Sequence, residues 1–358
     1  MYYKAESYIT DENYLLTYNV FEMGDIAFEG NKSKNFAHGR FVENTIGNGI
    51  VSHVFDVFKP RMTNYDLQFW KYAINNERIM GPILLRSTKA STMMTNLVAD
   101  DFLQENFLIP CYEEQKKIGE FLNQLDTLIT LHQRKHEKLV NIKKSMLDKM
   151  FPQNGVSVPE IRFKGFTDPW EQRKLGEICD FITKGATPTT YGFSWQPDGV
   201  PFFRNDSIKD NVFVFGEFSY ISEAANEVLK RSEVHGNDIL IAITGDIGKV
   251  GIIPDTVEKA NINQHIARVR IRKEALPYFV YQYLASDDTQ KEYQKIKTGL
   301  SMPQLSLEQV RDIVVKIPEF NEQGKIADCL RRIDTLITLH QREHIKPILE
   351  VKRVKRNE

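Results

Sequence analysis

The stretch most suggestive of bound phosphate lies at positions 244–251 and reads TGDIGKVG. A phosphate-binding loop of the GxxxxGK[ST] type needs glycine at position 243 and a hydroxyl residue after the lysine. The chain has Ile243 and Val250 at these places, so the pattern favours a β-turn that joins two strands. The sequence also lacks HExxH, GxSxG and Asn-Pro-Pro-aromatic motifs, and it shows no nuclease-like spacing of carboxylates. The residues therefore favour a binding or targeting protein over an enzyme.

Cysteine spacing and bulk charge narrow the class of protein further. Cys111, Cys179 and Cys329 are far apart and form no CxxC pair, which argues against a zinc site or a disulfide framework and indicates a reducing compartment. The formal net charge is −1, so total charge does not favour nucleic acid, although local patches rather than totals make such surfaces. No signal peptide and no apolar run of about 18 residues is visible. We therefore expect a cytoplasmic protein with no membrane partner.

The nine residues DTLITLHQR occur twice, at positions 126–134 and 334–342. They lie within an ungapped match of residues 109–139 to 317–347, where apolar or histidine positions alternate in steps of four and three. This spacing is typical of a coiled coil, so we expect two long helices that pack on each other. We interpret the paired histidines as matched polar positions that fix the register of the two helices, in preference to a metal site. The expected packing positions are Ile118, Leu122, Leu125, Ile129 and His132 in the first copy, and Ile326, Leu330, Ile333, Ile337 and His340 in the second.

Fainter similarity upstream of each helix predicts that a whole domain is duplicated. Residues 7–28 resemble 219–240, and residues 94–110 resemble 302–318. Short β-like runs, such as NDILIAITG and HIARVRIR, form the middle of the second copy. The repeat is far longer than the roughly 20–50 residues of a solenoid unit, so two domains are expected. The expected boundaries are a first globular domain at 1–110, a long helix at 111–152, a second globular domain at 153–318, and a distal helix and tail at 319–358.

Six motifs follow one another in the second half. They are VPEIRFKGFTDPWEQRKLGEI (158–178), FITKGATPTT (181–190), VPFFRNDSI (200–208), GDIGKVGII (245–253), NQHIARVRI (263–271) and KTGLSMPQLSLEQV (297–310). Each motif alone is a weak indication. In this order and spacing, and together with the duplicated helix, they resemble the specificity subunit of type I restriction–modification enzymes. The resemblance covers nearly the whole chain.

This resemblance implies an α+β fold: two globular target recognition domains, mixed α/β with small twisted sheets, separated by two long antiparallel coiled-coil helices. Each domain would read half of a bipartite double-stranded DNA target, and the helices would set the spacing and dock two modification (methyltransferase) subunits. Restriction (endonuclease and translocase) subunits would complete the complex. The chain itself would be non-catalytic and bind no cofactor, because S-adenosylmethionine, ATP and Mg²⁺ belong to the partner subunits. The alternatives are a protein-only scaffold and an inactive or shuffling fragment of such a subunit.

Candidate DNA-contacting residues follow from the chemistry that reads bases and holds phosphates. Arg, Lys, Asn, Gln and hydroxyl side chains make most such contacts, and glycine lets backbone approach a phosphate closely. In the second domain the candidates are Lys184, Gly185, Thr187, Thr189, Arg204, Asn205, Asp206, Lys249, Gln264, His265, Lys297, Thr298, Ser301 and Gln304. In the first domain they are Lys32, Lys34, Ser52, His53, Lys89, Ser91 and Asn96.

The two copies of the repeat differ at their start. Because Ser7 aligns with Ser219, the counterparts of residues 158–208 would precede Met1. We therefore expect the first recognition domain to be truncated at its N-terminus and to be less stable than the second.

Overall fold

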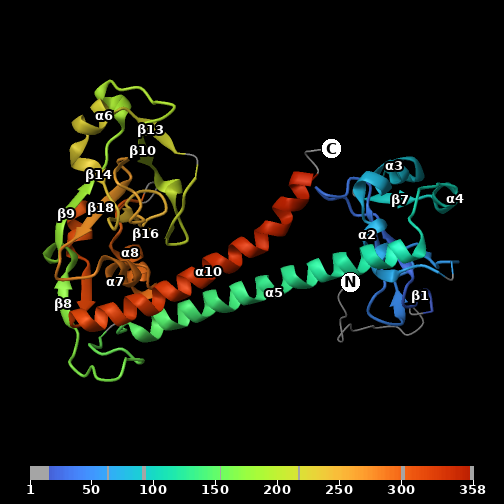
Figure 1. Ribbon diagram of the computed structural model, residues 1–358, viewed down its shortest axis with the longest axis horizontal. Coiled ribbons are helices and arrows are strands. Elements are labelled where there is room, and N and C mark those ends of the chain that lie inside the picture. Colours follow the sequence, from blue (N-terminus) through green and yellow to red (C-terminus); the bar gives the residue numbers. More distant parts are fainter. Residues whose placement is uncertain are drawn as a thin grey trace. The chain divides into compact units, whose positions relative to one another are not determined.

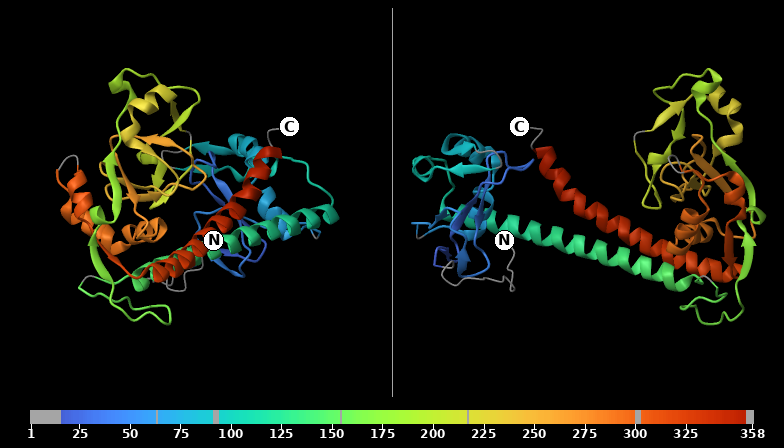
Figure 2. Two further views of the ribbon diagram at one scale, coloured as in Figure 1. Left: turned by 60° about the vertical axis from the view of Figure 1, so that its left-hand side comes forward. Right: turned by 180° about the vertical axis from the view of Figure 1, so that it is seen from behind.

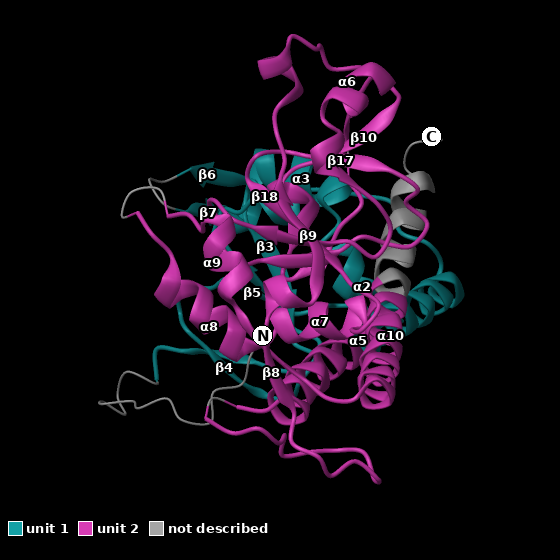
Figure 3. Cartoon of the chain, turned by 90° about the vertical axis from the view of Figure 1, so that its left-hand side faces the viewer, with its two compact units in different colours: residues 1–131 teal, residues 132–358 magenta. Residues whose placement is uncertain are grey.

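The computed structural model describes residues 16–354 except 63, 91–93, 154, 217 and 300–302, with side chains as far as Gln341. The chain forms two compact units, Met1–Leu131 (unit 1) and His132–Glu358 (unit 2), coloured teal and magenta in Figure 3. No helix in the described part of the chain combines the length and the apolar character needed to cross a membrane.

Unit 1 is built on a three-stranded antiparallel sheet with the order β3-β2-β5. Phe28 and Phe41 on neighbouring strands pack against Met80, Ile83 and Leu84 to form its core. The sheet strands are β2 (Ile26–Glu29), β3 (Arg40–Glu43) and β5 (Val57–Phe58); the other strands are β1 (Asn19–Phe21), which pairs with β4 (Gly49–Val51), and β6 (Thr88–Ala90), which pairs with β7 (Thr95–Leu97). The short helices are α2 (Leu67–Ala73), α3 (Glu77–Ser87) and α4 (Ala99–Leu103).

Unit 2 contains two four-stranded sheets. In the first, with the order β16-β15-β18-β9, Ile239 and Ile241 face one core cluster and Leu240 faces another, so β15 is buried on both sides. Its strands are β9 (Cys179–Lys184), β15 (Ile239–Ala242), β16 (Val250–Ile252) and β18 (Ile266–Ile271). The second sheet, β13-β10-β17-β14, consists of β10 (Val200–Phe203), β13 (Ser219–Ile221), β14 (Glu233–Val234) and β17 (Ala260–Ile262).

The described globular part of unit 2 also contains two further strand pairs, four α-helices and short 3₁₀ turns. Ser306 caps the N-terminus of α9 (Leu307–Asp312) with a capping box, in which its hydroxyl accepts a hydrogen bond from the Gln309 backbone N–H. The strand pairs are β8 (Glu171–Lys174) with β19 (Val314–Ile317), and β11 (Ile208–Lys209) with β12 (Val212–Phe213). The helices are α6 (Glu223–Val228), α7 (Pro277–Leu284), α8 (Asp287–Ile296) and α9 (Leu307–Asp312).

The two long helices are α5 (Tyr112–Met150) and α10 (Phe320–Val354). Within unit 2 they run side by side (Figures 1 and 2). Nδ1 of His132 lies 3.2 Å from Nδ1 of His340, and Nζ of Lys143 lies 2.7 Å from Oδ1 of Asp334. Later residues of α5 thus meet earlier residues of α10, which makes the pair antiparallel. Two mixed α/β domains with packed long helices confirm the predicted fold class.

The packing positions predicted on the long helices differ in burial. Leu330 and Ile326 are almost fully buried in the core of unit 2, and Ile333, Ile337 and His340 are half-buried. On α5, His132 is half-buried within unit 2. The remaining positions, Ile118, Leu122, Leu125 and Ile129, are half-buried in unit 1.

The internal repeat extends to individual hydrogen bonds. The backbone N–H of Glu22 donates to Asp25 Oδ2 at 2.8 Å, and that of His235 donates to Asp238 Oδ2 at 2.9 Å. Each half therefore places an interior strand of its sheet, β2 or β15, after the same aspartate-stabilised turn.

The repeated glutamine of each long helix makes the same two bonds. Gln115 Nε2 donates to Pro110 O at 2.9 Å, and Gln323 Nε2 donates to Pro318 O at 3.0 Å. Gln115 Oε1 accepts the backbone N–H of Asp66, the residue before α2, at 3.4 Å. Gln323 Oε1 accepts the backbone N–H of Leu276, the residue before α7, at 2.9 Å. This shared clamp explains why the motif Glu-Gln-x-Lys-Ile begins both copies, and it shows that α2 corresponds to α7.

Candidate nucleic-acid interface

The strand ends of unit 2 bring its candidate loops to one edge of the domain. Lys184 at the end of β9 pairs with Ala267, and Ala242 at the end of β15 pairs with Ile266. In the second sheet, Phe203 at the end of β10 lies in parallel register with Ile262 at the end of β17. We call the loops that leave this edge the loop surface. It comprises residues 184–190, 204–207, 243–249, 263–265, 297–299 and 303–304.

Hydrogen bonds between loops hold the loop surface together. Asn205 Nδ2 donates to Thr244 O at 2.8 Å, which links the loop after β10 to the turn after β15. That turn joins β15 to β16, as the sequence predicts for the Gly-Lys stretch. Thr244 also forms a bridge with Gln304, and Thr298 pairs with Gln304 through two backbone bonds of 2.8 and 3.0 Å. The loops of three predicted motifs, 200–208, 245–253 and 297–310, are therefore connected by these bonds.

Arg204 is held in an orientation suited to planar recognition. Its guanidinium lies 4.8 Å from the ring centroid of Trp195, and its Nη2 donates to Ser219 Oγ at 2.9 Å. A stacked guanidinium presents a fixed fork of N–H donors to a base edge or a phosphate. Trp195 was not singled out from the sequence, because an isolated aromatic in a loop gives no periodic signal. Asp206, next to Arg204, is exposed.

Thr187, Gln264 and His265 form a short directional chain across two loops. The Thr187 hydroxyl donates to Gln264 Oε1 at 2.5 Å, and Gln264 Nε2 lies 3.0 Å from His265 Nε2. Because the amide nitrogen of Gln264 is a donor, His265 Nε2 accepts and its proton resides on Nδ1. The amide of Gln264 is exposed and has a fixed orientation, as required of a side chain that reads a base.

The lysines and remaining candidates of unit 2 are placed as follows. Lys249 Nζ pairs with Asp246 at 2.7 Å, and Lys297 Nζ donates to Gln294 Oε1 at 2.8 Å. Lys184 and Thr189 are exposed. Ser301 lies outside the described residues.

Gly185 serves packing within the domain. A Cβ at this position would lie 1.9 Å from Ile262 O and 2.3 Å from Asn263 O, and the residue is buried. Glycine is required here because the chain after β9 approaches the end of β17 closely. The predicted contact of its backbone with a phosphate stays a prediction.

In unit 1 the structure brings four of the seven candidates close together. Lys89 and Asn96 are cross-strand partners in the β6–β7 hairpin. A bridge between Asn31 and Met94 places that hairpin beside the loop after β2, which carries the exposed Lys32 and Lys34. Ser52 and His53 lie in the turn before β5, where His53 Nδ1 is 3.5 Å from Thr17 Oγ1. Ser91 lies outside the described residues.

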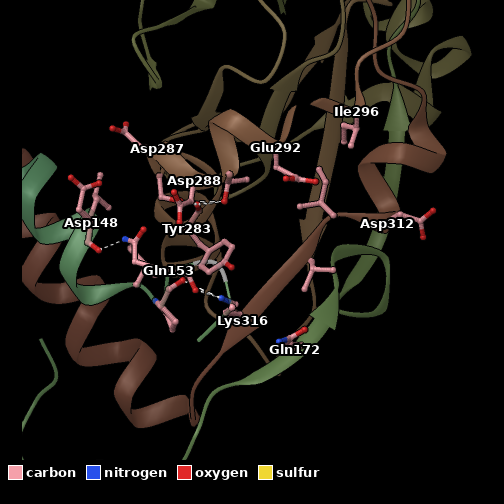
Figure 4. Close-up of a pocket in the computed structure, with 18 of the residues that line it drawn as sticks. Asp148, Gln153, Gln172, Tyr283, Asp287, Asp288, Glu292, Ile296, Asp312 and Lys316 are labelled. Carbon is pink, nitrogen blue, oxygen red and sulfur yellow. Dashed lines mark hydrogen bonds between the residues drawn. The ribbon is translucent and has the colours of Figure 1, made fainter. Parts of the chain in front are cut away.

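A separate cavity of about 630 Å³ lies in unit 2 between the end of α5, α8 and the β8–β19 pair (Figure 4). Its lining includes a single lysine, Lys316, whose Nζ donates to Gln153 O at 2.6 Å and Val156 O at 2.8 Å. Burial lowers the pKa of Lys316. The lining carries five carboxylates, which repel phosphate, so this cavity is not a DNA contact. Its carboxylates are Asp148, Asp287, Asp288, Glu292 and Asp312.

Within the described residues, no group of three or more His, Cys, Asp or Glu side chains is arranged to hold a metal ion. The three cysteines are free thiols. Burial raises the pKa of the Cys179 thiol to about 12, which keeps it protonated at neutral pH and suits a core residue.

The model of a family described as type I restriction modification DNA specificity domain matches residues 7–141 and 167–349. The putative type I restriction enzyme MjaX specificity subunit of Methanocaldococcus jannaschii is 28% identical over 245 residues, covering 66% of this chain and 54% of the relative. The type I restriction enzyme MjaVIII specificity subunit of the same organism is 28% identical over 255 residues, covering 68% of this chain and 59% of the relative. The chain thus spans little more than half the length of these curated relatives.

Among solved structures, the S subunit of a type I restriction–modification system from M. genitalium has a similar fold. The TM-score is 0.54 with 17% sequence identity, and the match covers 94% of this chain and 82% of that chain. At this identity the likeness concerns the fold.

Proposed function

Because the chain belongs to the family of type I restriction modification DNA specificity domains, we propose that it is the DNA sequence-specificity subunit of a type I restriction–modification complex. The family match falls on both halves, and each half consists of a mixed α/β domain followed by a long helix. The two halves would each read one part of a bipartite target.

The observation that carries this proposal is the loop surface of unit 2. It gathers Arg, Lys, Gln, Asn and Thr side chains from loops that are far apart in the sequence, and it fixes the geometry of Arg204 and Gln264. Arginine reads guanine and glutamine reads adenine through paired hydrogen bonds in the major groove. Lys184 and Lys297 supply charge for nearby phosphates.

The long helices would set the distance between half-sites and dock the methyltransferase subunits. α5 has 39 residues, which at about 1.5 Å per residue is roughly 58 Å. At about 3.4 Å per base pair along each strand, this equals about 17 base pairs. A helix of this length therefore suits a split target with an unread gap.

The chain would be non-catalytic. Two modification subunits would supply S-adenosylmethionine and methyl transfer, and restriction subunits would use ATP and Mg²⁺. This assignment agrees with a loop surface built for binding and with the lack of catalytic motifs in the sequence.

The experiment that tests this function is selection from a random duplex library by the chain co-expressed with its modification subunit. We expect enrichment of a defined sequence, and affinity that falls steeply as salt rises because phosphate contacts release counterions. Binding that is indifferent to sequence and to salt would contradict the proposal and favour a protein-only scaffold.

A further inference from the structure

The sheet β3-β2-β5 of unit 1 resembles the sheet β16-β15-β18-β9 of unit 2, but among the described residues it has no counterpart of β9. Ile26 of β2 pairs with Phe58 of β5, and Ile239 of β15 pairs with Val269 of β18. The residue after each of these partners approaches the turn aspartate: Lys59 Nζ lies 3.9 Å from Asp25, and Arg270 pairs with Asp238 at 2.6 Å. β5 therefore corresponds to β18.

The outer edge of β18 is covered by β9, over the register Ala267–Lys184 to Ile271–Cys179. In the described part of unit 1, the order β3-β2-β5 ends at β5. An uncovered strand edge offers N–H and C=O groups to an added strand.

A second edge in unit 1 shows the same difference. The ungapped match of the repeat makes residues 106–109 the counterpart of β19, which pairs with β8 in unit 2. Residues 106–109 form no strand with any described residue, and Leu108 is 97% exposed. Its counterpart Lys316 is 7% exposed.

The core next to these edges is also open in unit 1. In unit 2, Trp170 is 3% exposed and its ring lies 5.7 Å from that of Phe279 on α7. Leu175, Ile178 and Ile182 of the same segment enter the same core cluster. All of α7 from Phe279 to Leu284 is buried, whereas only Ala73 is buried in the corresponding α2.

A cavity of about 260 Å³ in unit 1 lies among β5, α2 and the segment before α5. It is lined by Phe58 of the uncovered strand, Trp70 of α2 and Phe107 of the uncovered segment. Other lining residues are Ile26, Phe41, Met62, Ile74 and Phe102. The cavity thus adjoins both uncovered edges and has the aromatic lining that suits an apolar anchor.

We propose that unit 1 binds an extended segment of another polypeptide with the chemistry of residues 169–184. This segment carries an aromatic anchor followed by two short strands. The anchor enters the cavity lined by Phe58, Trp70 and Phe107. One strand pairs with residues 106–109, as β8 pairs with β19, and the other extends the sheet beyond β5, as β9 does beyond β18.

The test uses the full chain and a synthetic peptide of residues 169–184, PWEQRKLGEICDFITK. Hydrogen exchange is followed by mass spectrometry while the peptide is titrated. We expect saturable protection, at least tenfold, of backbone amides at 57–59 and 106–109, with no change in unit 2.

Two peptide variants sharpen the test without altering the chain. Ile182→Asp changes a side chain that is 5% exposed in unit 2, and Phe181→Ser changes its neighbour, which is 49% exposed. We expect the Ile182→Asp peptide to give no protection and the Phe181→Ser peptide to protect as the original does. The proposal is overturned by an absence of protection at millimolar peptide or by equal protection from both variants. It is also overturned if the peptide displaces the chain's own residues 169–184 and so changes the exchange of unit 2.

Discussion

At the scale of residues, Arg204 is the side chain of the loop surface best placed to read a base. Its guanidinium lies over the Trp195 ring, and the bond from Nη2 to Ser219 uses one of its five N–H donors. The chemistry of this residue could be predicted from its type and from the motif VPFFRNDSI. Its stacking partner could not, because the packing of two loops depends on tertiary structure that no local pattern encodes.

Replacing Arg204 by alanine should therefore reduce sequence-specific binding by the assembled complex roughly 10- to 100-fold, the range for loss of one paired base contact. Replacing it by lysine should recover charge but not discrimination, because lysine lacks the planar fork. Lys291→Ala, on α8 beside Asp288, is the control and should leave binding unchanged. Binding is measured by fluorescence anisotropy on the selected sequence and on a scrambled duplex. Equal losses for Arg204→Ala and Lys291→Ala would contradict the assignment.

A second residue-scale prediction concerns Glu43 of unit 1. Its carboxylate oxygens are buried without a hydrogen-bond partner among the described residues, and burial, with a smaller contribution from Asp66, raises its pKa to about 8. A folded pKa above the unfolded value means that the folded state holds the proton more tightly. The contribution to stability is therefore largest below the unfolded pKa, 4.5, and falls as pH rises toward 8.

Glu43→Gln should remove this pH dependence and stabilise unit 1 by roughly 2–5 kcal/mol at pH 8. The measurement is hydrogen exchange of the β2 and β3 amides at pH 5 and pH 8, corrected for intrinsic rates. Glu29→Gln is the matched control, because Glu29 pairs with Arg40 at 2.7 Å and its pKa is lowered. That variant should be neutral or destabilising. A Glu43→Gln variant that is less stable than the parent at pH 8 would refute the prediction.

At the scale of elements, each long helix is clamped to its domain by one buried glutamine. Gln323 is 1% exposed and joins Leu276 N to Pro318 O. Gln323→Ala leaves both backbone groups without a partner, so we expect unit 2 to lose about 1–3 kcal/mol. Urea denaturation followed by circular dichroism measures this loss. Asn321→Ala, an exposed neighbour, should cost less than 0.5 kcal/mol or so, and a similar cost for both variants would contradict the clamp.

The long helices could be predicted from the sequence. The four–three spacing of apolar residues is a local signal for each helix, and the exact nine-residue repeat is a long-range signal that relates the two helices. The strand order could not be predicted. β10 and β17 pair in parallel across more than fifty residues, and no turn signal fixes such a register. For the same reason the loop surface was predicted as separate motifs, and its connection through Asn205, Thr244 and Gln304 emerged only from the structure.

At the scale of the whole molecule, the proposed function makes helix length a determinant of target spacing. Duplicating seven residues in each helix, 125–131 in α5 and 333–339 in α10, preserves the heptad and adds about 10 Å. We expect the gap between half-sites to grow by about three base pairs, while both half-sites stay the same. Insertion of seven residues in only one helix is the control and should abolish specific binding. An unchanged gap in the double variant would show that the helices do not set the spacing.

Under the proposed function, this chain directs a methyltransferase to a split DNA sequence. The most direct measurement is a genome-wide map of methylated adenine in a host that lacks adenine methylation and expresses the chain with its modification subunit. We expect methylation at one bipartite motif with a fixed gap. Methylation that follows no motif, or one contiguous motif, would contradict it.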